Sequence, residues 1–196
     1  MYLFTYRCCV KSFEIMKKVL IIIIIMFGFF SKVNSAYEKL AYEFKFSGIE
    51  GNLINLKDYE NKVIVVVNVA SRCGFTNQYE DLQTLWSNYK EKNVVVLGVP
   101  TNNFKQEPGS NKEIKDFCET NFNISFPMTE KIDVIGNNAH PFFIWAKENH
   151  GKSAIPKWNF HKIIIGKDGK VVDTFSSITK PSSQKFIKLI EKEIKN

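Results

Sequence analysis

The sequence has few residues suited to binding a metal ion or a phosphate group. Its three histidines and four cysteines do not show the paired spacing of zinc sites. Its ten glycines form no phosphate-binding loop. No Cys-x-x-Cys pair is present, so the neighbouring thiols that disulfide exchange requires are missing. We therefore expect neither a metal nor a cofactor.

The positive charge of the chain is concentrated at its beginning. The formal net charge is +7, of which residues 1–35 carry +4 and residues 36–196 carry +3. The basic residues are almost all lysines, which lack the flat guanidinium fork that reads base edges. This near-neutral body argues against nucleic-acid binding.

The first residues have the layout of a signal peptide. Val19–Phe30 is apolar apart from one glycine and follows two lysines. Because a bilayer span needs roughly 20 residues, this run is short for a membrane anchor. We predict that residues 1–35 are a signal or targeting segment, cleaved after Ser35, which leads into the secretory pathway; onward delivery to an organelle such as a plastid stays open. The alternatives are a retained anchor and a cytosolic protein made from an internal start at Met16 or later.

Residues 36–196 contain no repeat or linker, which predicts one domain. Residues 44–46 and 52–56 alternate around a glycine-containing turn and predict an antiparallel hairpin. Val63–Ala70 and Val94–Val99 are apolar runs typical of strands buried on both faces. With a helix between them, these two strands form a crossover unit and are parallel.

Apolar residues at helical spacing predict four helices, and a turn signal near the end predicts a second hairpin. The helices are indicated by Leu82, Leu85, Trp86 and Tyr89; by Ile114, Phe117 and Cys118 after the capping pattern of Ser110 and Glu113; by residues 141–149; and by Phe186, Ile187, Ile190 and Ile194. The second hairpin joins residues 160–165 to residues 170–175. This order predicts an α/β thioredoxin-like fold, with a central mixed sheet flanked by helices and an N-terminal β-hairpin.

Cys73 lies three residues after the first buried strand and just before a predicted helix, where α/β sheets carry their functional loops. The unpaired N–H groups at a helix start stabilise the nucleophilic thiolate, and Arg72 adds a positive charge. The residue three positions on is Thr76, not a second cysteine. From position alone, Cys73 can also be a small buried hydrophobe.

A peroxide reductase needs a thiolate, hydrogen-bond donors that hold the thiolate and the peroxide, and a group that protonates the departing oxygen. Loop amides and an indole can supply them. The predicted loops that contain such groups are Asn68–Gly74, Phe104–Asn111 and Lys157–Phe160.

These loops resemble the motifs of the glutathione peroxidase family, and the resemblance covers nearly all of residues 36–196. The matching segments are Asn68–Gly74, Gln106–Gly109 and Trp158–Phe160. The resemblance implies that Cys73 is the peroxidatic residue, in the cysteine rather than the selenocysteine form. It implies that Gln106, Trp158 and Asn159 complete a catalytic tetrad. The loop before Gln106 is one residue shorter than the usual form of the family.

The chain resembles the thioredoxin-dependent members of the family, which form an internal disulfide. The segment Asp116–Thr120 resembles their resolving segment and implies that Cys118 is the resolving cysteine. The stretch between Phe126 and Pro141 is short, so the subunit-assembly loop of tetrameric members is absent. The resemblance therefore implies a monomer that reduces hydrogen peroxide and organic or lipid hydroperoxides in the response to oxidative stress, with transient contact with membrane lipid.

Two alternatives stay open. Cys118 shares an apolar stripe with Ile114 and Phe117, so it can be an inert core residue, and glutathione is then the main reductant. A thioredoxin-fold redox sensor or binding protein can also use Cys73 to relay oxidation, and catalytic turnover distinguishes it from an enzyme. A peroxiredoxin ranks below both because Val69–Cys73 lacks the proline of that family.

Overall fold

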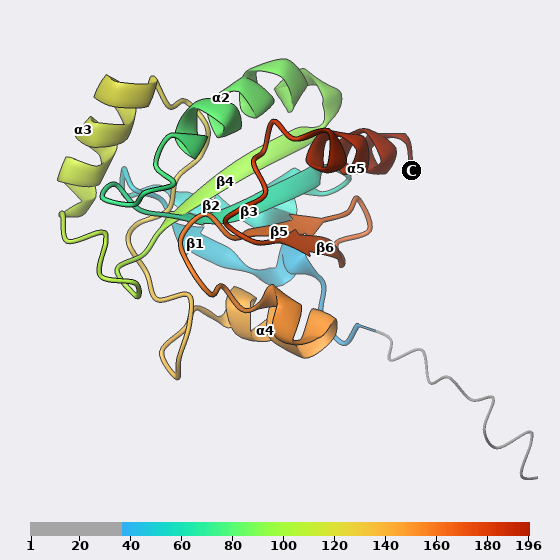
Figure 1. Ribbon diagram of the computed structural model, residues 1–196. Helices are drawn as coiled ribbons and strands as arrows, with labels where there is room; N and C mark the ends of the chain where they lie inside the picture. Colours follow the sequence, from blue (N-terminus) through green and yellow to red (C-terminus); the bar gives the residue numbers. More distant parts are fainter. Residues whose placement is uncertain (1–36) are drawn as a thin grey trace, which may run out of the picture. The chain divides into compact units, whose positions relative to one another are not determined.

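The computed structural model describes residues 37–196, so the predicted signal segment and its cleavage after Ser35 lie outside the described residues. Elements carry the labels of Figure 1. The strands are β1 Lys45–Ser47, β2 Leu53–Asn55, β3 Val63–Val69, β4 Val94–Pro100, β5 Lys162–Ile165 and β6 Val171–Phe175. The α-helices are α2 Gln78–Tyr89, α3 Asn111–Phe122, α4 Pro141–His150 and α5 Gln184–Lys195.

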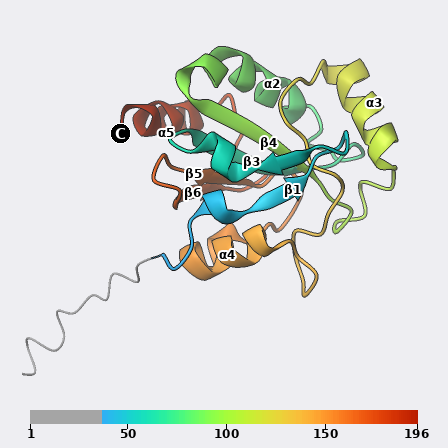
Figure 2. The same ribbon diagram turned by 180° about the vertical axis from the view of Figure 1, so that it is seen from behind.

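The main sheet has the strand order β4-β3-β5-β6. Strand β3 pairs in parallel with β4, while β5 pairs antiparallel with β3 and with β6. Helices α2 and α5 cover one face, whereas α4 and the hairpin of β1 and β2 lie on the other (Figures 1 and 2). The predicted mixed sheet, flanking helices and N-terminal hairpin are therefore confirmed.

The core forms around β3 and β4, in which every residue is buried. Their β-branched side chains suit the pleated surface of a sheet that is covered on both faces. Leu82 and Leu85 from α2 and Phe186 and Ile190 from α5 pack against the same cluster. Each such side chain contributes about 1.5–3 kcal/mol relative to leaving it exposed, so β3 is held firmly in the core of the molecule.

Strand β5 begins two residues later than its apolar pattern predicts. Phe160 has a φ of 62°, which no strand residue adopts, so the strand starts at Lys162. The segment that follows α3 is attached to β4 by an isolated bridge between Gly98 and Met128 and by a hydrogen bond from the Ile132 N–H to the Pro100 carbonyl. A Cβ atom on Gly98 would lie 3.0 Å from the Phe126 ring, so glycine permits this close approach.

Lys162 is fully buried, which the sequence does not predict for a lysine. Its Nζ donates hydrogen bonds to Gln78 Oε1 at 2.5 Å and to the Thr179 carbonyl at 2.8 Å. Gln78 in turn donates to the Ser177 carbonyl at 2.6 Å. Burial lowers the pKa of Lys162 to about 7, and nearby Asp81 opposes this change. The lysine thus joins the start of α2 to the segment after β6.

Replacing Lys162 with methionine should remove a pH dependence of stability. The native protein holds the Lys162 proton less tightly than the unfolded chain, whose lysine has a pKa near 10.5. The unfolding free energy of the parent should therefore rise with pH between about 7 and about 10.5. Urea denaturation at several pH values measures this slope. Lys188→Met, which changes an exposed lysine on α5, should keep it; equal slopes in the two variants would contradict the assignment.

Candidate active site

Cys73 lies in the turn between β3 and α2, and its side chain is only 8% exposed. Its Sγ accepts a hydrogen bond from the Phe75 N–H at 3.4 Å. The Cys73 N–H donates to Thr76 Oγ1 at 3.1 Å, and the Thr76 N–H donates to the Cys73 carbonyl at 3.0 Å. Thr76 therefore closes the turn at the position where a disulfide exchange enzyme would carry its second thiol.

The loop that carries Gln106 is bonded to the Cys73 turn. The Arg72 N–H donates to the Gln106 carbonyl at 3.1 Å. The Glu107 carboxylate accepts hydrogen bonds from the Ser71 N–H at 2.6 Å and the Ser71 hydroxyl at 2.9 Å. Burial raises the pKa of Glu107, while its bonds to Ser71 oppose the rise. The loop is closed by Asn102 Oδ1, which accepts from the Glu107 N–H at 3.0 Å.

Asn68 attaches the third segment to the end of β3. Its Nδ2 donates to the Trp158 carbonyl at 3.1 Å, and its Oδ1 accepts from the His161 N–H at 3.1 Å. Its backbone carbonyl accepts from the Phe160 N–H at 2.6 Å. The buried carboxamide thus places the segment of Trp158 and Asn159 at the same end of β3 as Cys73.

Gln106 and Asn159 are in direct contact. Asn159 Nδ2 donates to Gln106 Oε1 at 2.8 Å, and the Asn159 side chain is fully buried. Within residues 37–196 no hydrogen bond uses Gln106 Nε2, so its N–H groups are available to a bound oxygen or sulfur. Trp158 is 41% exposed and packs against Phe104, with the ring centroids 5.5 Å apart. The site therefore offers an amide and an accessible indole as donors.

Backbone strain flanks both amides. Lys105, immediately before Gln106, has a φ of 60°, and Phe160, immediately after Asn159, has a φ of 62°. A left-handed conformation costs a non-glycine residue about 1–3 kcal/mol and persists only where its surroundings impose it. The hydrogen bond of the Lys105 N–H to the Asn102 carbonyl and the burial of the Phe160 ring do so here.

The loop 100–105, although short, thus brings Gln106 to Asn159. Sequence reasoning assigned no role to four residues that hold the site together: Asn68, Ser71, Thr76 and Glu107. Three of them lie within the segments that match the family motifs, so their place in a motif could have indicated that they matter for the site. Their function as supports becomes visible only from their hydrogen-bond partners.

Cys118 lies on the buried side of α3, away from these loops in sequence, and is 1% exposed. Both Cys73 and Cys118 are free thiols. Burial raises the pKa of Cys118 to about 11; the Tyr79 hydroxyl opposes the rise, and nearby Glu107 and Glu119 add to it. In this dithiol form Cys118 is a protonated core residue.

Within the described part of the chain, no group of three or more histidine, cysteine, aspartate or glutamate side chains is arranged to hold a metal ion. In the same part, no helix is long and apolar enough to cross a membrane.

A single cysteine at the end of a central strand, with loop amides and an indole carried by neighbouring segments, defines a thiol-dependent site on a thioredoxin-like fold. Because Thr76 replaces a second thiol in the turn, this arrangement suits peroxide reduction better than disulfide exchange.

Comparisons with known proteins agree with that class. The sequence model described as "Glutathione peroxidase" matches residues 41–147. A hydroperoxy fatty acid reductase of Synechocystis sp. is 44% identical over 149 residues, covering 71% of this chain and 88% of the relative. The glutathione peroxidase-like peroxiredoxin 2 of Saccharomyces cerevisiae is 44% identical over 147 residues, covering 72% and 90%. The chain belongs to the glutathione peroxidase family and is a peroxidase.

Solved structures confirm the fold. The crystal structure of T. cruzi GPX1 matches with a TM-score of 0.63 at 31% identity, covering 81% of this chain and 98% of that chain. A thioredoxin-family thiol:disulfide interchange protein from Chlorobium tepidum matches with a TM-score of 0.61 over 81% of this chain and 98% of its own. Its identity is only 14%, so this second likeness shows the thioredoxin-like fold alone.

Gln106→Ala should slow the oxidation of Cys73 by peroxide about ten- to a thousandfold, as the loss of a preorganised donor does. Trp158→Ala should have a similar effect. Stopped-flow oxidation of the reduced protein measures this step separately from turnover. Gln83→Ala is the control, because Gln83 is bonded to Ser125 outside the site. Full oxidation rates in both site variants would refute the tetrad assignment.

Proposed function

We propose that Cys73 reduces hydrogen peroxide and organic or lipid hydroperoxides. The Cys73 thiolate attacks one peroxide oxygen; an S–O bond forms, the O–O bond breaks, and water or an alcohol leaves after taking up a proton. Cys73 is thereby oxidised to a sulfenic acid. The observation that carries this proposal is the continuous set of hydrogen bonds from the Cys73 turn to Gln106 and Asn159. Gln106 and Trp158 donate to the thiolate and the peroxide.

Cys118 then resolves the sulfenic acid as an internal disulfide with Cys73, which thioredoxin reduces. A disulfide requires Cα atoms within about 7 Å, and Cys118 is packed into the core on α3. The helix must therefore open near Cys118. The buried Cys118 thiol is protonated and is therefore a poor nucleophile. This supports a mechanism in which peroxide oxidises Cys73 and not Cys118.

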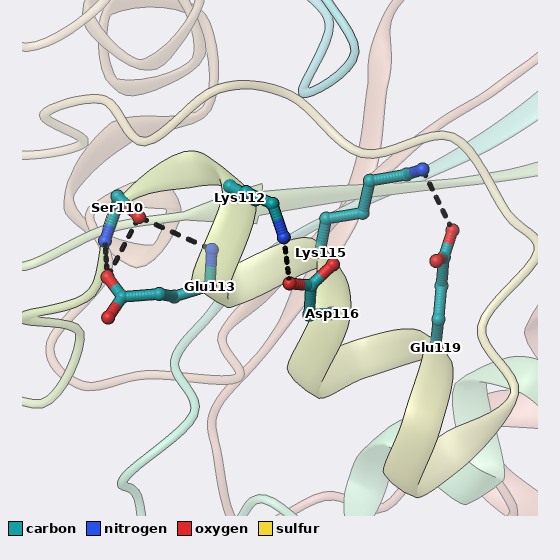
Figure 3. A network of polar contacts seen from close by, with 6 residues as sticks. All are labelled: Ser110, Lys112, Glu113, Lys115, Asp116 and Glu119. Carbon is teal, nitrogen blue, oxygen red and sulfur yellow. Dashed lines mark hydrogen bonds and ion pairs between the residues drawn. The ribbon is translucent and has the colours of Figure 1, made fainter.

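The beginning of α3 is well anchored. The Ser110 hydroxyl accepts from the Glu113 N–H, and the Glu113 carboxylate accepts from the Ser110 N–H at 2.7 Å, which completes a capping box (Figure 3). Figure 3 also shows the ion pairs Lys112–Asp116 and Lys115–Glu119 along the helix. These pairs are largely exposed and stabilise the helix little, so the capping box restrains the start of α3 more strongly than they do.

The last turn of α3 is the weaker end. Asn123 follows it with a φ of 49°, and the Ile124 N–H bonds to the Cys118 carbonyl at a long 3.3 Å. A cavity of about 330 Å³, lined among others by Cys118, Ile124 and Phe126, adjoins this turn. Segments that border a cavity and have few packed neighbours on that side open at a low free-energy cost, which favours opening at this end of the helix. This geometry supports a rearrangement near Cys118.

Thioredoxin is the proposed reductant because relatives that are 44% identical to this chain are named glutathione peroxidase-like peroxiredoxins. The name of the Synechocystis relative, a hydroperoxy fatty acid reductase, supports lipid hydroperoxides as substrates.

The exposed indole of Trp158 beside Phe104 supports transient contact with a lipid surface. The short segment between Phe126 and Pro141 supports a monomer. Glutathione dependence and a redox-sensor role are the competing functions.

Variants of the two cysteines test this cycle. Cys73→Ser should abolish reduction of cumene hydroperoxide and keep the fold. Cys118→Ser should be oxidised once by peroxide and then fail to turn over with thioredoxin, because no thiol converts the sulfenic acid to a disulfide. NADPH consumption, coupled either to a thioredoxin system or to a glutathione system, measures turnover. Undiminished thioredoxin-driven turnover of Cys118→Ser would refute the resolving role, and faster turnover with glutathione would favour the competing reductant.

We also propose that residues 1–35 direct the chain into the secretory pathway and are removed after Ser35. The apolar run after two lysines supports this proposal. N-terminal sequencing of the protein purified from its native cells should begin at Ala36. A mature chain that begins at or near Met16 would indicate the internal start instead.

A further inference from the structure

Tyr79 has a buried hydroxyl that the peroxidase site does not use. It lies in the first turn of α2, six residues after Cys73, and is 0% exposed. Within the described part of the chain its hydroxyl has no hydrogen-bond partner. Because an unpaired buried hydroxyl destabilises the folded protein, its presence calls for an explanation.

The ring of Tyr79 contacts both a loop of the peroxide site and the end of α3, the helix that carries Cys118. One neighbour is Phe160, which follows Asn159, with ring centroids 5.2 Å apart. Another is Phe122, the last residue of α3, also at 5.2 Å between centroids. Cys73 and Cys118 belong to the same buried cluster as Tyr79. The tyrosine therefore lies between the loops of the peroxide site and the end of the helix that must open.

The Tyr79 hydroxyl also lies beside the Cys118 thiol, and it is the group that opposes the burial-driven rise in the pKa of Cys118. The dithiol form has no well-formed hydrogen bond between them. The other titratable groups near the pair are Glu107, Glu119 and Cys73, all of which disfavour a further negative charge. Tyr79 is thus the neighbour of Cys118 that is able to donate a hydrogen bond to the Cys118 thiolate.

We propose that the Tyr79 hydroxyl donates a hydrogen bond to the Cys118 thiolate and thereby sets the rate of disulfide formation. The inference rests on the proposed resolving role of Cys118. In this step Cys118 loses its proton and its sulfur attacks the sulfur of the Cys73 sulfenic acid. The S–S bond forms, the S–O bond breaks, and the departing hydroxide takes up a proton as water. No outside oxidant is needed, and Tyr79 keeps its proton.

Tyr79→Phe tests the proposal because it removes only the hydroxyl oxygen. We expect a melting temperature equal to or above that of the parent, since an unpaired hydroxyl is lost. We expect an unchanged rate of Cys73 oxidation. The Cys73–Cys118 disulfide should form about ten- to a hundredfold more slowly, as loss of a hydrogen bond to a charged group implies. Rapid mixing with one equivalent of peroxide, alkylation at timed intervals and mass spectrometry follow both steps.

Tyr89→Phe is the matched control. Tyr89 lies on the same helix, but its hydroxyl is bonded to Glu191 on the surface. This variant should form the disulfide at the parent rate. Excess peroxide should also drive more Cys73 to sulfinic acid in Tyr79→Phe than in Tyr89→Phe, because the sulfenic acid persists longer.

Several outcomes would overturn the proposal. Parent-rate disulfide formation in Tyr79→Phe, with Cys118→Ser still unable to turn over, would refute the donor role and leave the resolving role intact. An equal slowing of the peroxide step would place the action of Tyr79 at Cys73 instead. A Tyr79→Phe protein that fails to fold would show that the hydroxyl is not unpaired. Thioredoxin-driven turnover by Cys118→Ser would remove the resolving role and the inference together.

Discussion

The buried carboxamide of Asn68, at the end of β3, supports most of the site. It donates to the Trp158 carbonyl and accepts from the His161 N–H, while its backbone carbonyl accepts from the Phe160 N–H. Strand β3 is hydrogen-bonded on both sides and is buried along its whole length. A segment that is bonded to this strand therefore shares its rigidity, which peroxide chemistry needs because its donors must be in place before the reaction.

Glu107 connects the loop that carries Gln106 to the Cys73 turn, through its hydrogen bonds to Ser71. Its burial disfavours the charged carboxylate, yet the N–H and the hydroxyl of Ser71 both donate hydrogen bonds to that carboxylate. The left-handed residues Lys105 and Phe160 add strain on either side of the Gln106–Asn159 contact. Packing and hydrogen bonds elsewhere offset these costs. Holding the Gln106 and Asn159 side chains together therefore has a cost in folding free energy.

The local features of the fold could be predicted from the sequence, and the exceptions have physical causes. The strands β3 and β4 are continuous β-branched runs, and the capping box at Ser110 depends on residues three positions apart. The start of β5 was predicted wrongly because Phe160 adopts a left-handed conformation, is buried and bonds to the carbonyl of Asn68, a residue far away in the chain. The burial of Lys162 was not predicted because lysine pairs with partners from α2 and the segment after β6.

The sequence by itself determined the element order, the single cysteine of the turn and the motifs that identify the family, because these depend on residue type and short spacing. Only the tertiary structure decided that Gln106 bonds to Asn159, 53 positions away. It also decided that Cys118 is enclosed beside Tyr79. Such contacts form when distant segments pack against one sheet, and hydrophobic patterns and motifs carry no information on which side chains then meet.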